Sequence, residues 1–101
     1  MKRFFLAGLM LVLIFWCIHL EAETTVRILS YNIHHGEGQD KQLDLERIAR
    51  IIESNKGDII CLQEVDKNLK RSQKLDIAQV LGKRLNMQVC FGVNYLFSGG
   101  E

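Results

Sequence analysis

The chain has 101 residues, a formal net charge of +1 and no proline. Without residues 1–22 it keeps eleven Lys or Arg and eleven Asp or Glu, so the net charge of the remainder is zero. Domains that hold nucleic acid mainly through bulk charge are usually distinctly basic. The composition therefore argues against that mode of binding, although it leaves room for a local basic patch.

The N-terminus has the pattern of a secretory signal peptide. A basic start, Met1-Lys2-Arg3, precedes an uninterrupted apolar run over residues 4–18, and the segment closes on the small residue Ala22. We therefore predict a signal peptide over residues 1–22, a mature chain over 23–101 and a secreted or periplasmic location. The run is shorter than the ~20 apolar residues of a membrane span, so an uncleaved membrane anchor is the weaker alternative.

Two strands joined by a helix are predicted next. Residues 26–33 and 58–65 are apolar runs of strand length. Between them Asp44 is a candidate N-cap, and Asn55-Lys56-Gly57 supplies a glycine stop. The apolar residues of this segment recur at helical spacing, namely Leu45, Ile48, Ala49 and Ile52.

A second helix and a third strand complete the predicted order. Ile77, Ala78, Leu81 and Leu85 form a helical face that ends at Asn86, and residues 87–93 are expected to return to a strand. The first two strands are apolar on both faces, which is typical of strands covered by layers on each side. We expect an α/β (α+β) fold with an open sheet edge, which is one piece of a larger domain.

Cys61 and Cys90 are expected to be buried free thiols, with a mutual disulfide as the alternative.

Each of the first two strands is followed by a polar residue. Asn32 ends the first strand and Glu64 lies at the end of the second. If the strands are parallel neighbours, these side chains meet at the carboxyl edge of the sheet, where open α/β sheets bind ligands. An amide oxygen beside a carboxylate suits Mg²⁺ and a phosphate.

These residues also carry a family resemblance. Ser30-Tyr31-Asn32-Ile33-His34-His35-Gly36, followed some thirty residues later by Asp58-Ile59-Ile60-Cys61-Leu62-Gln63-Glu64-Val65-Asp66, resembles the N-terminal portion of the endonuclease/exonuclease/phosphatase family, which has the deoxyribonuclease I-like fold. The resemblance implies a four-layer α-β-β-α sandwich and metal-dependent hydrolysis of phosphoesters.

The resemblance also implies residue roles. Glu64 matches the family's Mg²⁺-binding glutamate, and Asn32 matches its asparagine that contacts the metal site and the scissile phosphate. The cofactor implied is Mg²⁺, with Mn²⁺ as the alternative. The family's catalytic histidine, its water-orienting Asp/Asn pair and its terminal Asp-His pair have no match in these 101 residues. This chain alone is therefore expected to be inactive.

Neighbouring polar residues are weaker candidates. Of the adjacent His34 and His35, one is expected to reach a phosphate, for which we take His34, and the other to face solvent, because neighbours along an extended chain point opposite ways. A zinc site built from the two is an alternative. Within the basic segment after Glu64, Arg71 is the candidate phosphate clamp, and Asp66 would position the segment. On a helix its four basic residues would form one stripe: Lys67, Lys70, Arg71 and Lys74.

The sequence thus predicts an exported, Mg²⁺-dependent phosphoester hydrolase. Its substrate class stays open among nucleic acid, phospholipid head groups and small phosphate esters, and no stable protein partner is implied. Two alternatives remain. One is an exported binding module on the same fold without the chemistry, and the other is an unrelated doubly wound ligand-binding domain, in which Asn32 and Glu64 would only line a cleft.

Overall fold

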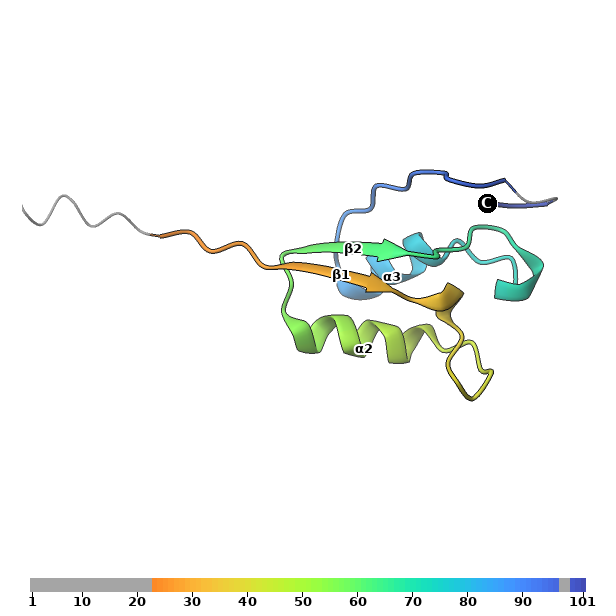
Figure 1. Ribbon diagram of the computed structural model, residues 1–101, viewed down its shortest axis with the longest axis horizontal. Coiled ribbons are helices and arrows are strands. Elements are labelled where there is room, and N and C mark those ends of the chain that lie inside the picture. Colours follow the sequence, from red (N-terminus) through yellow and green to blue (C-terminus); the bar gives the residue numbers. More distant parts are fainter. Residues whose placement is uncertain (1–22, 97–98) are drawn as a thin grey trace, which may run out of the picture.

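The computed structural model describes residues 23–96 and 99–101. Two parallel strands form its sheet, in which Ile28 pairs with Ile59 and Asn32 pairs with Gln63 (Figure 1). The predicted order of strand, helix, strand and helix is confirmed. The elements are β1 (Ile28–Asn32), η1 (His34–Gly36), α2 (Leu45–Asn55), β2 (Ile59–Gln63), η2 (Lys70–Ser72) and α3 (Ile77–Leu85).

The predicted signal peptide lies outside the described residues. Among the residues that the structure describes, no helix combines the length and the apolar character needed to cross a membrane.

Helix α2 begins where its sequence predicts. The side chain of Asp44 accepts a hydrogen bond of 2.9 Å from the backbone N–H of Arg47, which satisfies one of the free N–H groups of the first turn. The helix ends at Lys56, which takes the left-handed conformation with φ 50°, so the prediction that Gly57 provides the stop is wrong. Gly57 is instead confined by packing, since a Cβ there would lie 2.7 Å from Cδ1 of Ile60.

Helix α3 is capped at both ends and packs on α2. Asn86 ends the helix with φ 54°, as its sequence predicts. The N-cap is Asp76, which was not among the predicted caps and accepts a hydrogen bond of 3.1 Å from the N–H of Gln79. Arg84 then reaches across to α2, where its guanidinium donates to both Glu46 and Glu53 at 2.8 Å. These ion pairs connect exposed side chains of the two helices.

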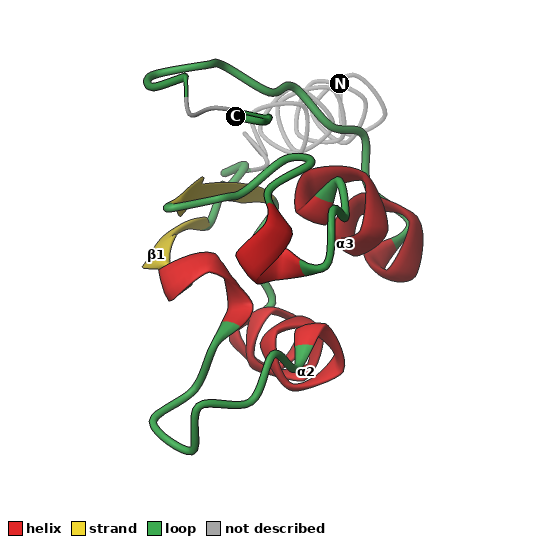
Figure 2. Ribbon diagram, turned by 90° about the vertical axis from the view of Figure 1, so that its right-hand side faces the viewer, coloured by secondary structure: helices red, strands yellow, loops and turns green. Residues whose placement is uncertain are grey.

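Both helices lie on the same side of the sheet (Figure 2). In each strand the residues alternate between exposed and half-buried, and the half-buried ones face the helices. The fully buried cluster beneath them consists of Ile33, Ile48, Ala49, Ile52, Ile77 and Leu81.

The outer face of the sheet differs from the prediction. Ile28 and Ile59 are 66% and 49% exposed, so the described residues supply a layer on only one face of the strands. Cys61 lies on the same outer face and is exposed, as is Cys90, and both are free thiols. The expectation of buried cysteines is therefore wrong, whereas the expectation of free ones holds.

Two further predicted elements are not formed. Residues 87–96 run beside β2 on the side away from β1 (Figure 1) without entering a strand, because their backbone makes no ladder with β2 in the described structure. The four basic residues 67, 70, 71 and 74 do not lie on one helix. Lys70 and Arg71 belong to the short 3-10 helix η2, whereas Lys67 and Lys74 lie outside it, and the backbone takes positive φ at Asn68, Gln73 and Lys74.

Candidate metal and phosphate site

The side chains of Asn32 and Glu64 meet at the carboxyl edge of the sheet. The amide nitrogen Nδ2 of Asn32 donates a hydrogen bond of 2.8 Å to Oε1 of Glu64. Asn32 pairs with Gln63, so regular strand alternation would turn the next residue, Glu64, to the face of the sheet opposite to Asn32. The backbone of Glu64 instead takes a positive φ of 56°. Such a conformation costs about 1–3 kcal/mol in a non-glycine residue. The predicted juxtaposition is confirmed, and the backbone at Glu64 is what makes it possible.

A left-handed turn follows β1 and is tied to both strand ends. His34, His35 and Gly36 have positive φ values of 46°, 45° and 86°. The amide oxygen of Asn32 accepts from the N–H of His34, and the carbonyl of Glu64 accepts from the N–H of His35, each at 2.9 Å. Asn32 therefore holds Glu64 with one end of its amide and the turn with the other.

Glycine is required in this turn. At φ 86° a side chain is strained, and a Cβ at Gly36 would lie 2.7 Å and 2.8 Å from methyl groups of Leu45 and Leu43. The turn thus packs directly against the start of α2, which keeps the two histidines in place.

The two histidines do not diverge, so that expectation is wrong. Their ring centroids lie 4.4 Å apart, and one ring nitrogen from each lies within 4.8 Å of the other and of a Glu64 oxygen. The expectation assumed an extended chain, whereas the left-handed turn gathers successive side chains. The side chain of His35 is 12% exposed, while His34 is exposed.

Asp66 and Arg71 form a second polar pair close by. Nε and Nη2 of Arg71 donate to the two carboxylate oxygens of Asp66 at 2.8 Å and 2.7 Å. Burial opposes ionisation of Asp66, but hydrogen bonds from Arg71 and Ser72 outweigh it and hold the pKa of this carboxyl below its usual range. Asp66 is buried and its carbonyl accepts from the N–H of Ile77. It therefore positions the loop that carries Arg71, in line with its predicted role.

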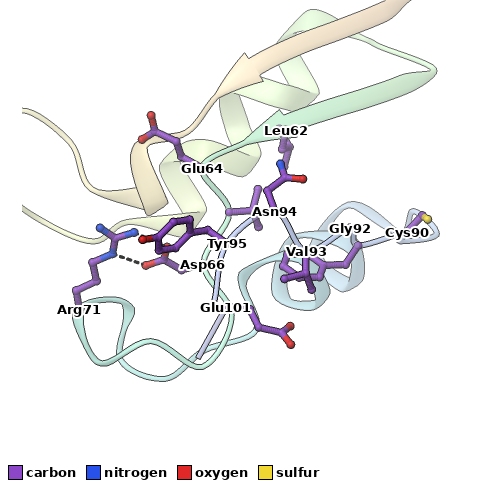
Figure 3. A pocket seen from close by; sticks show the side chains of 12 residues that line it. Leu62, Glu64, Asp66, Arg71, Cys90, Gly92, Val93, Asn94, Tyr95 and Glu101 are labelled. Carbon is purple, nitrogen blue, oxygen red and sulfur yellow. Dashed lines mark hydrogen bonds and ion pairs between the residues drawn. The ribbon is translucent and has the colours of Figure 1, made fainter. Parts of the chain in front are cut away.

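Glu64 and Arg71 line one cavity of about 450 Å³. Figure 3 shows the carboxylate of Glu64 pointing away from the Asp66–Arg71 pair, so the carboxylate of Glu64 and the guanidinium of Arg71 do not face each other. The guanidinium is engaged by Asp66, and its role as a phosphate clamp stays a prediction.

Several residues of this region were missed by sequence reasoning. Residues 90–95 line the cavity together with Glu101, and Tyr95 and Asn94 belong to this group. No local pattern marks them, because only the path of the chain after α3 brings them beside β2. Glu37 is also unmarked by any motif of the sequence, and its carbonyl oxygen lies 3.3 Å from Nδ1 of His34.

The donor set at the strand ends suits a hard divalent cation. Glu64 offers a carboxylate, and the amide oxygen of Asn32 keeps a second lone pair besides the one used by His34. Mg²⁺ is bound by one or two carboxylates, with waters and substrate phosphates completing its octahedron. The residues present fit that pattern, although the roles of Asn32 and Glu64 as metal ligands stay predictions.

Open α/β sheets bind their ligands outside the carboxyl ends of the strands, which is where the amide of Asn32 and the carboxylate of Glu64 meet. Residues 29–100 match the family model described as Endonuclease/Exonuclease/phosphatase family. The chain belongs to this family, as its motifs predict. Its members are in general divalent-metal-dependent hydrolases that act on phosphoesters such as nucleic acids. Neither the search of the curated proteins nor that of the solved structures found a match.

Proposed function

We propose that this chain is the N-terminal part of an exported, Mg²⁺-dependent phosphoester hydrolase. The observation that carries the proposal is the 2.8 Å hydrogen bond between Asn32 and Glu64 at the carboxyl edge of a family domain. Export rests on the signal-like start of the sequence, through Ala22.

In this proposal Glu64 holds the metal and Asn32 orients both the carboxylate and the scissile phosphate. When bound, the cation polarises the phosphoryl oxygen and stabilises the leaving oxygen. The amide of Asn32 keeps Glu64 in one orientation, because its nitrogen donates to the carboxylate while its oxygen is held by the N–H of His34. Such positioning needs no reorganisation when the substrate arrives.

We propose further that the domain continues beyond residue 101 and that the chain alone is not a competent hydrolase. The exposed apolar side chains of Ile28 and Ile59 support a covering layer from elsewhere in the protein. Among the described residues, Glu64 is the carboxylate that meets Asn32 at this site, and none of the motif residues matched here is a candidate for the residue that activates water. The open sheet edge should make the isolated chain prone to associate.

The substrate class can be found with a panel of three probes. The full-length protein that begins with this chain is assayed on plasmid DNA, phosphatidylcholine vesicles and p-nitrophenyl phosphate, before and after removal of metal by EDTA and return of Mg²⁺. We expect one probe to be cleaved, with activity lost on chelation and restored by Mg²⁺. Absence of cleavage of all three would contradict the hydrolase and favour the binding module.

In the same assay Glu64→Gln should lose activity. Its matched control is Glu53→Gln on α2, an exposed carboxylate at the opposite end of the strands, which should keep activity. Residues 23–101 expressed alone should have none. Mg²⁺-dependent turnover by the isolated segment, abolished by Glu64→Gln, would overturn the proposal that the domain must continue.

A further inference from the structure

We propose that His34, His35 and Glu64 form a binding site for a transition-metal ion of the zinc class. One ligand atom from each residue lies within 4.8 Å of the other two. Ligand atoms around Zn²⁺ sit about 2.0–2.2 Å from the ion, so a side-chain movement of about 1 Å closes the site around it. The site shares Glu64 with the proposed function, but it does not require that the protein be a hydrolase.

The donor chemistry distinguishes this site from a magnesium site. Imidazole nitrogen suits zinc, copper, iron and nickel, whereas magnesium takes oxygen ligands. Two imidazoles and one carboxylate also leave a fourth position open to water or a substrate oxygen, which is the arrangement of a catalytic rather than a structural zinc site. The exposure of His34 and Glu64 keeps that position accessible.

Glu37 supplies the outer contacts that metal-binding histidines use. Its carbonyl oxygen lies at hydrogen-bond distance, 3.3 Å, from Nδ1 of His34, whereas its carboxylate oxygen Oε2 lies 3.7 Å from Nε2 of His35, which is longer than a hydrogen bond. Histidine ligands commonly donate their second ring N–H to a carbonyl or carboxylate, which fixes the ring and the tautomer. The contact to His34 leaves its Nε2 for the metal.

The backbone holds the three residues together before any metal arrives. His35 donates its N–H to the carbonyl of Glu64, and His34 donates its N–H to the amide oxygen of Asn32, each at 2.9 Å. The turn and the end of β2 are therefore one unit. A transition metal at this site would occupy Glu64 and so compete there with Mg²⁺.

The test is a metal titration of the full chain in which the three cysteines, Cys17, Cys61 and Cys90, are replaced by serine, because free thiols also bind zinc. Zn²⁺ binding is measured by calorimetry and Co²⁺ binding by visible absorption. We expect one ion per chain, with at least tenfold weaker binding in His34→Gln and in His35→Gln. The matched control is Glu53→Gln, an exposed carboxylate near the C-terminal end of α2, which should bind as tightly as the parent.

If the histidine variants fail to fold, X-ray absorption of the zinc-loaded parent still identifies the ligands of the zinc ion. Two imidazole ligands support the site, whereas an oxygen-only shell, or an affinity unchanged in both histidine variants, overturns it.

Phosphoesterase assays separate this inference from the proposed function. Zinc bound through the histidines of this chain, with no phosphoester cleaved by the full-length protein that begins with it, refutes only the hydrolase. Glu64-dependent hydrolysis with no histidine-dependent zinc binding refutes only this inference.

Discussion

At the scale of single residues, the site depends on backbone conformations that side chains rarely adopt. Glu64 and His34 both have positive φ, and each is stabilised by hydrogen bonds with Asn32. Strain of this kind persists only where the surroundings hold it in place, and it is common at functional sites. The asparagine amide therefore contributes twice, since it orients a carboxylate and anchors a strained turn.

Gly36→Ala should lower the free energy of unfolding by about 2–4 kcal/mol, since the substitution combines a strained φ with overpacking against Leu43 and Leu45. The matched control is Gly92→Ala, because a Cβ at Gly92 would meet nothing within 4 Å. Urea denaturation of the two variants measures the difference. Equal stabilities would show that the turn is not confined as described.

Asp66→Asn should destabilise the chain by about 1–3 kcal/mol at pH 7, with the half-exposed Arg71 keeping the loss below that of a fully buried pair. The folded state lowers the pKa of Asp66. Its contribution is therefore complete above the unfolded-state pKa of about 3.9 and is lost as the pH falls through the lower folded value.

Urea denaturation of the parent and of Asp66→Asn at pH 7 and below about pH 3 checks this, and the gap between them should narrow in acid. Asp40→Asn, which removes an exposed partner of Arg47, should have the smaller effect at pH 7. A gap that widened in acid would contradict the assigned direction of the pKa.

At the scale of elements, the helices follow from their sequences, whereas other elements depend on partners. The apolar spacing and the caps Asp44 and Asp76 are local signals, and both helices begin there. Residues 87–93 have strand-like composition but form no ladder, since a strand needs a neighbour that composition does not reveal. The grouping of His34 with His35 was missed because a run of positive φ values is not marked by the residue types.

The packing of α3 on α2 should depend on apolar burial more than on ion pairs. Leu81 is 2% exposed within the core, and Leu81→Ala should cost about 2–5 kcal/mol of unfolding free energy. Arg84→Met removes two exposed ion pairs with Glu46 and Glu53 and should cost much less. Thermal or urea denaturation ranks the two, and the reverse order would place the helix contact in the ion pairs.

At the scale of the whole molecule, one covered and one exposed sheet face are the main feature. The exposed side chains include Ile28 and Ile59, and the carboxyl edge of the same strands carries Asn32 and Glu64. The position of the candidate site was predictable, because the carboxyl ends of two neighbouring parallel strands lie at the same edge of the sheet. The exposure of the outer face in the described part of the chain was not predictable, because apolar strands alone do not say which elements pack on them.

Export is tested on the whole protein. The mature chain should begin near Glu23, because the basic start and apolar run before it form a signal-like segment. N-terminal sequencing or intact mass of the exported product measures this. Recovery of the chain from a membrane fraction with residues 1–20 retained would support the anchor instead.

The most direct test of the central claim, that Glu64 holds the catalytic metal, is the dependence of kcat/KM on Mg²⁺ in the full-length protein. Glu64→Gln keeps size but removes the charge, so kcat/KM should fall at least about 100-fold at limiting Mg²⁺. Alanine at Lys67, Lys70 or Lys74 should cost less than about fivefold, and Arg71→Ala should fall between. A Glu64→Gln protein within a few-fold of the parent at limiting Mg²⁺ would contradict the claim.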